Sequence, residues 1–182
     1  MSTTNNAYLP LLQTKTAFTT RIPKIIGIYG VSGCGKSYLL EQLKGHFDEK
    51  SFFFYEGSER LVKAFQNTLD SFKCLPIHAQ ETIRARAIEG ISRECAKAGK
   101  AGIVIGHYSF CRKPTNTIPG DPSTEIEHEV VMTDADKKAY THILYLKPSP
   151  ETIVEQVAKD ESRQRQHLNA ATIRQWQDFE EE

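Results

Sequence analysis

The stretch Lys24 to Leu43, KIIGIYGVSGCGKSYLLEQL, decides the fold of this chain. Its first residues form a short apolar run typical of a β-strand, its middle is rich in glycine, and its last residues place leucines at helical spacing. The middle, Gly30 to Ser37, fits the pattern G-x-x-x-x-G-K-[ST], in which successive backbone N–H groups turn inward around phosphate oxygens. The stretch therefore predicts a strand, a phosphate-binding loop and a helix in immediate succession.

The same loop supplies the predicted nucleotide-binding residues. Lys36 is expected to reach the terminal phosphates, and Ser37 is expected to place its hydroxyl on Mg²⁺. The N-terminus of the following helix adds its positive dipole end. The predicted cofactor-binding residues are Gly30, Val31, Ser32, Gly33, Cys34, Gly35, Lys36, Ser37 and Tyr38, with Ser37 as the predicted metal ligand.

Composition limits the classes of function. The chain has 182 residues, of which 39% are hydrophobic and 25% are charged, as expected of one domain with a single core. Its 23 basic and 23 acidic residues give a formal net charge of +0, so the overall charge does not indicate nucleic acid or an anionic membrane surface. No apolar run approaches the roughly 18 residues of a membrane span. We therefore expect no membrane partner, and nucleic acid is not the favoured ligand.

The cysteines and the N-terminus predict compartment and domain organisation. Four widely spaced cysteines without a C-x-x-C pair indicate neither a zinc site nor a disulfide framework. A chain that uses cytosolic nucleotide with free thiols is expected in the cytoplasm. Residues 1–22 are predicted to form a flexible arm, and residues 23–182 the domain. The alternative for the arm is an organelle transit peptide, because Met1 to Thr20 lacks acidic residues, although Lys15 is its one basic residue.

A second apolar run, Ser51 to Tyr55, predicts a buried parallel strand. Ligands of open α/β sheets bind beyond the carboxyl ends of the strands, so Glu56 and Glu59 are candidates to orient or deprotonate an acceptor and to help place Mg²⁺. Ser58 is expected to cap the next helix, and Arg60 is a candidate substrate contact. The alternative is that both carboxylates are solvated and that Glu59 only favours the helix dipole.

His107 follows a third predicted strand, Gly102 to Gly106, at a place where phosphate-loop NTPases usually carry an aspartate. The histidine weakens a motor-type or GTPase interpretation, and the sequence contains no N-K-x-D signature of guanine binding. His107 is either a structural residue or a group on the substrate side. Arg112 belongs to a proline-rich segment, residues 111–124, which is expected to lack regular structure and either meets an anionic acceptor or is solvent-exposed.

Further patterns predict the rest of the fold. Helices are expected over residues 76–99 and 134–139, from Pro150 onward and after Asn169, and a strand is expected over residues 142–146. Weak alternation over residues 125–133 predicts an edge strand or an extended segment. Trp176 in the last helix is expected to pack in the core rather than to stack on a base.

A polar segment, residues 159–167, follows the helix that begins at Pro150. Arg163 and Arg165 can both point at phosphate oxygens if the segment is extended or closes as a lid. A phosphoryl-transfer enzyme could swing an arginine over the leaving phosphate from this position. The alternative is a solvated helix end in which Asp160 and Glu161 pair with the two arginines.

Together, GVSGCGKS, the acidic turn after the second strand and the R-x-R segment resemble the small-molecule and nucleotide kinases of the phosphate-loop superfamily, the adenylate kinase and gluconate kinase type. FYEGSE, THILYL and RQWQ are similar to a kinase-like module of fungal proteins that is often joined to a haloacid-dehalogenase-type phosphatase. The resemblance implies a three-layer α/β fold with a central parallel sheet in 2-3-1-4 order, ATP and Mg²⁺ as cofactors, and a fused or associated phosphatase module as a partner. These kinases also have a fifth strand, for which the sequence shows no segment after the Trp176 helix.

The leading functional prediction is an ATP-dependent phosphotransferase that acts on a hydroxyl of a small metabolite or nucleotide. Its predicted catalytic residues are Lys36, Glu56, Glu59, Arg163 and Arg165. A catalytically weak ATP-binding regulatory or scaffold module is the alternative. A polynucleotide 5′-hydroxyl kinase is a further alternative, to which the neutral net charge lends no support.

Overall fold

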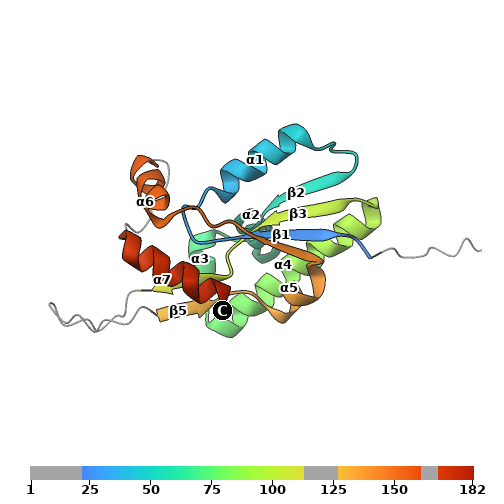
Figure 1. The fold of residues 1–182 in the computed structure, drawn as a ribbon. Helices are drawn as coiled ribbons and strands as arrows, with labels where there is room; N and C mark the ends of the chain where they lie inside the picture. The colour runs from blue at the N-terminus through green and yellow to red at the C-terminus, as the bar shows by residue number, and fades with distance from the viewer. Residues whose placement is uncertain (1–21, 113–126, 161–167) are drawn as a thin grey trace, which may run out of the picture.

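The computed structural model describes residues 22–112, 127–160 and 168–182. In these residues four parallel strands form one sheet: β1 (Ile25–Tyr29), β2 (Phe52–Glu56), β3 (Ala101–Ile105) and β6 (His142–Tyr145). The strands lie side by side in the order β2-β3-β1-β6. Because β6 is the fourth strand of this sheet along the chain, the predicted 2-3-1-4 order is confirmed (Figure 1).

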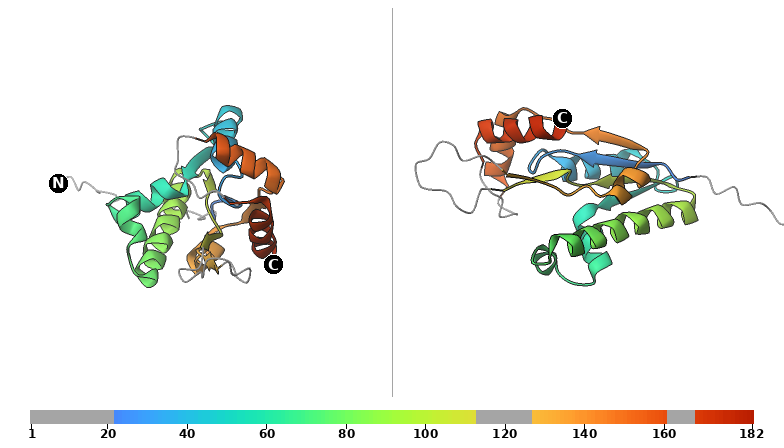
Figure 2. Two further views of the ribbon diagram at one scale, coloured as in Figure 1. Left: turned by 90° about the vertical axis from the view of Figure 1, so that its left-hand side faces the viewer. Right: turned by 90° about the horizontal axis from the view of Figure 1, so that it is seen from below.

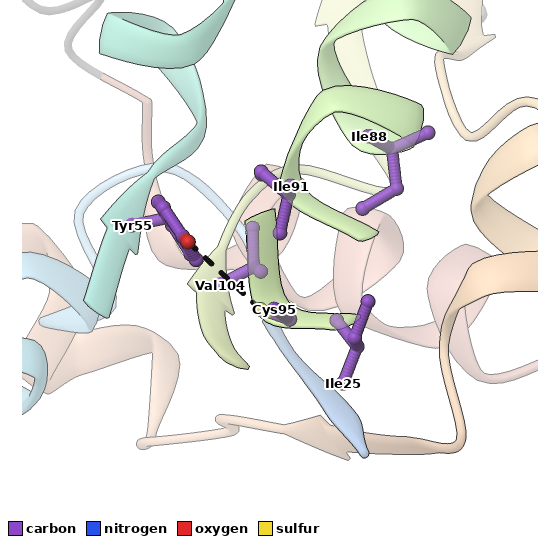
Figure 3. Packing of buried hydrophobic residues seen from close by; sticks show 6 residues of the cluster. All are labelled: Ile25, Tyr55, Ile88, Ile91, Cys95 and Val104. Carbon is purple, nitrogen blue, oxygen red and sulfur yellow. Dashed lines mark hydrogen bonds between the residues drawn. The ribbon is translucent and has the colours of Figure 1, made fainter. Parts of the chain in front are cut away.

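Helices lie on both faces of this sheet and complete a three-layer α/β fold (Figures 1 and 2). The helices are α1 (Lys36–His46), α2 (Gly57–Phe65), α3 (Leu69–Lys73), α4 (Ile77–Ala98), α5 (Asp134–Ala139), α6 (Pro150–Lys159) and α7 (Ala170–Glu181). On one face, Leu40 of α1 packs against Ile28 of β1. On the other face, Ile91 and Cys95 of α4 pack against Ile25 of the same strand (Figure 3). A strand covered on both faces needs apolar residues at successive positions, which explains why β1 reads IIGIY.

Most helix ends follow the chemistry expected from the sequence. α4 ends at Gly99, whose φ of 65° is favourable for glycine, and the side chain of Ser149 accepts a hydrogen bond from the N–H of Thr152 at the start of α6. Asn169 caps α7 in the same way, and Thr133 forms a capping box at α5. The predicted ends of α4, α6 and α7 are therefore confirmed.

The start of α2 differs from the prediction. The helix begins at Gly57 with Glu56 as its N-cap, so Ser58 lies inside the first turn and no side chain caps the helix. A Cβ atom on Gly57 would lie 2.8 Å from the carbonyl oxygen of Ile105. Glycine therefore allows β2 to pass directly into α2 against the neighbouring strand, and this leaves no loop residue for Ser58 to occupy as a cap.

The edge strands are less buried than their apolar sequences predict. The phenylalanines of β2 are only half-buried, because β2 has a neighbour on one side alone. In β6 the side chains of Ile143 and Leu144 are 51% and 56% exposed. Within the described residues β6 ends the sheet, so an apolar run here marks an edge strand rather than a fully buried one.

An antiparallel pair of strands extends beyond the end of β3. β4 (Ser109–Arg112) pairs with β5 (Glu127–Val130), with Phe110 opposite Glu129. The sequence predicted no strand at β4, and it predicted β5 as an edge or extended segment rather than as part of a separate sheet. Local alternation could not decide this, because the pairing depends on two segments that are far apart in the chain.

Several predictions fall outside the described residues: the N-terminal arm up to residue 21, the loop from residue 113 to 124, and Arg163 and Arg165. In the part of the chain that is described, no helix combines the length and the apolar character that a bilayer crossing needs.

Candidate phosphate-binding site

The loop between β1 and α1 depends on glycine. Gly30, Gly33 and Gly35 have φ angles of 146°, 89° and 95°, a region that other residues rarely occupy. At Gly30 a Cβ atom would also lie 2.6 Å from the carbonyl oxygen of Leu146 and 2.8 Å from Cys34 Sγ. The glycines of the sequence pattern are therefore required by both the backbone conformation and the space around it.

Helix α1 begins directly after this loop, and no side chain caps its N-terminus. Gly35 occupies the N-cap position, and the first turn contains no acidic residue. The first N–H groups of a helix need acceptors from outside the helix, and its dipole favours negative charge at this end. This helix end therefore suits an anion such as a phosphate group.

Lys36 is the cation of the loop. Its side chain is buried, and its ammonium donates to the carbonyl oxygens of Gly30 at 2.6 Å and Val31 at 3.0 Å. Cys34 Sγ lies 3.7 Å from the same nitrogen. Burial raises the pKa of the Cys34 thiol, and the nearby ammonium only partly opposes this effect. The loop thus holds one positive charge beside a thiol that stays protonated at neutral pH.

Ser37 and Glu56 are in contact at the carboxyl ends of the strands. The Ser37 hydroxyl donates to Glu56 Oε1 at 3.4 Å, although 19 residues separate them. The strand register places Glu56 beside Ile105, and the N–H of Gly106 donates to the carbonyl oxygen of Ile28 at 3.1 Å. The carboxyl ends of β2, β3 and β1 therefore lie together around the start of the loop.

The donor atoms present fit a nucleotide with Mg²⁺. Mg²⁺ takes six oxygen ligands and usually keeps several waters while it binds one or two protein oxygens and substrate phosphates. Ser37 and Glu56 offer such a small set of protein oxygens next to the loop. Lys36 and the uncapped N–H groups of α1 offer positive partners for the phosphates.

The two candidates on α2, Glu59 and Arg60, lie in surroundings that differ from those of Glu56. Glu59 is exposed in the first turn of the helix. Arg60 forms an ion pair with Glu94 at 2.7 Å and lies over the ring of Tyr55 at 5.0 Å. Arg60 therefore ties α2 to α4, and its charge is paired within the protein.

The remaining candidates lie after β3, on α1 and at the end of β4. His107 follows β3, and its ring centroid lies 4.8 Å from that of Phe110. Tyr38 is 72% exposed on the first turn of α1. Arg112 is the last residue of β4. The structure thus brings Lys36, Ser37 and Glu56 together, while Tyr38 points to solvent.

A polar group behind the loop was not predicted from the sequence. Trp176 is buried as expected, but its Nε1 also donates to Ser109 Oγ at 2.8 Å, and Glu180 Oε1 accepts from the same hydroxyl at 2.8 Å. The partners are separated by 67 and 71 residues. No local pattern could have indicated them, because serine and glutamate at such positions normally face solvent.

Comparison with solved structures finds similar chains at low sequence identity. A sugar kinase from Janibacter sp. HTCC2649, solved without ligand, is 15% identical with a TM-score of 0.48, and the match covers 85% of this chain and 75% of the kinase. A chain of the Pnkp1/Rnl/Hen1 complex is 15% identical with a TM-score of 0.45, and the match covers 80% of this chain and 42% of that one. Comparison with curated proteins finds no match.

A protein-family model described as an AAA domain matches residues 29–174. The match begins one residue before the phosphate-binding loop and contains Lys36, Ser37, Glu56 and His107. It thus spans the loop, the strands β2, β3 and β6 and the carboxyl edge described above, together with the last residue of β1. The chain therefore belongs to the AAA-domain family, within the kinase-like branch of the phosphate-loop nucleotide-binding proteins.

Proposed function

We propose that this protein is an ATP-dependent phosphotransferase that moves the γ-phosphate of ATP to a hydroxyl of a small metabolite or nucleotide. The observation that carries the proposal is the contact between Ser37 Oγ and Glu56 Oε1 at 3.4 Å, beside the loop that holds Lys36. It joins a phosphate-binding loop to a carboxylate at the carboxyl edge of the sheet, where open α/β folds bind their ligands.

Each residue has a role that follows from its position. Lys36, the loop N–H groups and the N-terminus of α1 would hold the phosphates of ATP. Ser37 and Glu56 would hold Mg²⁺, which neutralises phosphate charge when it is bound. Glu56 also lies where a carboxylate could orient or deprotonate the acceptor hydroxyl. We infer that His107, which follows the end of the neighbouring strand β3, would contact the acceptor.

The first test is consumption of ATP by the purified protein with Mg²⁺ and a panel of acceptors. The panel should contain sugars, polyols, nucleosides, nucleotides and a 5′-hydroxyl oligonucleotide. We expect one small-molecule class to stimulate formation of ADP and to become phosphorylated. Tight binding of Mg·ATP without stimulation by any acceptor would instead support an ATP-binding regulatory module, and transfer to the oligonucleotide would support a polynucleotide kinase.

The role of Glu56 can be tested with the substitution Glu56→Gln, which keeps the shape of the side chain but removes its charge. We expect kcat/KM to fall by about 10- to 100-fold and the Mg²⁺ concentration needed for half-maximal rate to rise, as is usual when a group that supports a metal site is neutralised. The measurement is the initial rate of ADP formation as a function of Mg²⁺ concentration.

Glu41→Gln is the matched control, because Glu41 is exposed on α1 and forms a surface ion pair with Lys44 at 2.6 Å. It should retain the wild-type rate and Mg²⁺ dependence. Glu59→Gln tests the second carboxylate of the sequence prediction. A large loss in Glu59→Gln together with unchanged kinetics in Glu56→Gln would transfer the proposed role to Glu59.

A further inference from the structure

The last helix, α7, contributes buried polar groups to the back of the phosphate-binding loop. Ser109, at the start of β4, is fully buried, and Trp176 of α7 is 4% exposed. Glu180 lies one helical turn beyond Trp176 on the same helix and is half-buried. None of these three residues has a role in the phosphate transfer proposed above. Figure 1 shows α7 next to β5, which pairs with β4.

Hydrogen bonds connect the three residues in a defined direction. Glu180 Oε1 accepts from both the backbone N–H and the hydroxyl of Ser109, at 3.1 and 2.8 Å. The Ser109 hydroxyl donates a hydrogen bond to the carboxylate and accepts one from Trp176 Nε1 at 2.8 Å. The carboxylate therefore sets the orientation of Ser109, and Ser109 sets the orientation of the indole.

The indole also contacts the loop. Trp176 packs in one buried cluster with Val31 and Cys34 of the phosphate-binding loop, together with Ile153 of α6 and Ile173 of α7. A buried aromatic ring fixed at one end by a hydrogen bond makes a rigid support for the residues packed on its faces. Trp176 thus links the underside of the loop to Ser109.

Ser109 in turn belongs to the segment that leaves β3. The Tyr108 carbonyl accepts from the N–H groups of Val131 and Met132, and Ser109 is bound to Glu180, so the segment is tied on both sides. His107 lies two residues before Ser109 and directly after the carboxyl end of β3. A shift of Ser109 would therefore move the part of the chain next to the proposed acceptor side.

Tyr145, at the end of β6, lies near the same Glu180 carboxylate. It is the last residue of β6 and lies beside Tyr29, which immediately precedes the loop. Burial and the nearby Glu180 carboxylate raise the pKa of Tyr145. In the described residues, Glu180 Oε2 and the Tyr145 hydroxyl are both buried without a hydrogen-bond partner. Glu180 therefore lies between Ser109, at the start of β4, and Tyr145, at the end of β6.

From this geometry we propose that Glu180 is a positioning residue of the nucleotide site, which acts through Ser109 and Trp176 to hold the loop and the segment after β3 in register. The inference rests on the proposed function only in taking Mg·ATP as the ligand. It requires no phosphate transfer, because its direct effect is on how the loop is held.

The experiment uses Trp176, which is the sole tryptophan of the chain, as an intrinsic reporter. Titration of the full chain with Mg·ATP should change tryptophan emission in the wild type, because the indole packs on the loop. Glu180→Ala should raise the Kd for Mg·ATP by about tenfold, as measured by calorimetry, and should reduce the emission change. Glu180→Gln keeps the Oε1 acceptor, so its Kd should stay within about threefold of the wild type.

Asp178→Ala is the matched control, because Asp178 is an exposed acidic residue of the same helix. Its Kd and emission change should equal those of the wild type. If Glu180→Ala does not fold, Ser109→Ala is tested in its place. That variant removes the hydroxyl that connects Glu180 to Trp176, but it keeps the hydrogen bond from the backbone N–H of residue 109 to Glu180. The same loss of affinity is then expected.

Wild-type affinity in Glu180→Ala, even with a lower melting temperature, would overturn the proposal, because a purely structural residue moves stability alone. Equal weakening in Glu180→Ala and Glu180→Gln would also contradict it. Failure of the proposed phosphotransferase function is a separate outcome, seen as binding of Mg·ATP without transfer to any acceptor.

Discussion

Replacing Lys36 by alanine is expected to lower the rate of phosphate transfer by at least about 10²- to 10³-fold, the usual cost of removing one strong electrostatic contact from a transition state. The reason is the position of the ammonium, which is buried within the loop and bonded to the carbonyl oxygens of Gly30 and Val31. Alanine cannot supply a positive charge there. The measurement is ADP formation with the acceptor that gives the highest rate.

Lys44→Ala is the control for this variant, because Lys44 lies on the same helix and pairs on the surface with Glu41. It should keep full activity. Circular dichroism and thermal unfolding should show that Lys36→Ala retains the fold, since the contacts it loses are confined to the loop. Full activity in a folded Lys36→Ala protein would eliminate the proposed mechanism.

Gly30→Ala is expected to destabilise the protein by about 3 kcal/mol and to abolish binding of Mg·ATP. A backbone conformation that disfavours side chains costs about 1 to 3 kcal/mol, and a steric overlap in a packed site adds a similar amount. Here φ is 146°, and the new Cβ would lie 2.6 Å from the carbonyl oxygen of Leu146. Urea unfolding measures the stability change, and calorimetry measures the loss of binding.

Gly45→Ala gives the opposite expectation and serves as the matched control. Gly45 lies within α1, and a Cβ atom there would have nothing within 4 Å. Alanine should raise the free energy of unfolding by about 0.5 to 1 kcal/mol, because glycine is a poor helix former. If Gly30→Ala were as stable as Gly45→Ala, the loop could not have the conformation described here.

Local patterns predicted most of the elements and many of their ends, but not α3 or β4. The glycine-rich loop, the Ser149–Pro150 start of α6 and the Gly99 end of α4 were all predicted because each depends on residues within about one helical turn. The order of the strands was predicted only through resemblance to a family. Periodicity alone does not state which strands are neighbours.

Arg60 illustrates the limit of that local analysis. Its place near the end of β2 made it a candidate substrate contact, but the structure pairs it with Glu94, which lies 34 residues away. The burial of the strands also depended on contacts between residues far apart in the chain. The apolar runs of β2 and β6 predicted strands correctly, but their exposure depends on which strands lie beside them.

The sequence by itself determined the phosphate-binding loop, because its glycines, Lys36 and Ser37 are adjacent in the chain and their conformations are set locally. Only the tertiary structure decided what surrounds the loop. Glu56 reaches Ser37, and Glu180 reaches Ser109, through the packing of a sheet and helices whose residues are 19 and 71 positions apart. Such contacts depend on how whole elements are arranged, so no short pattern in the chain encodes them.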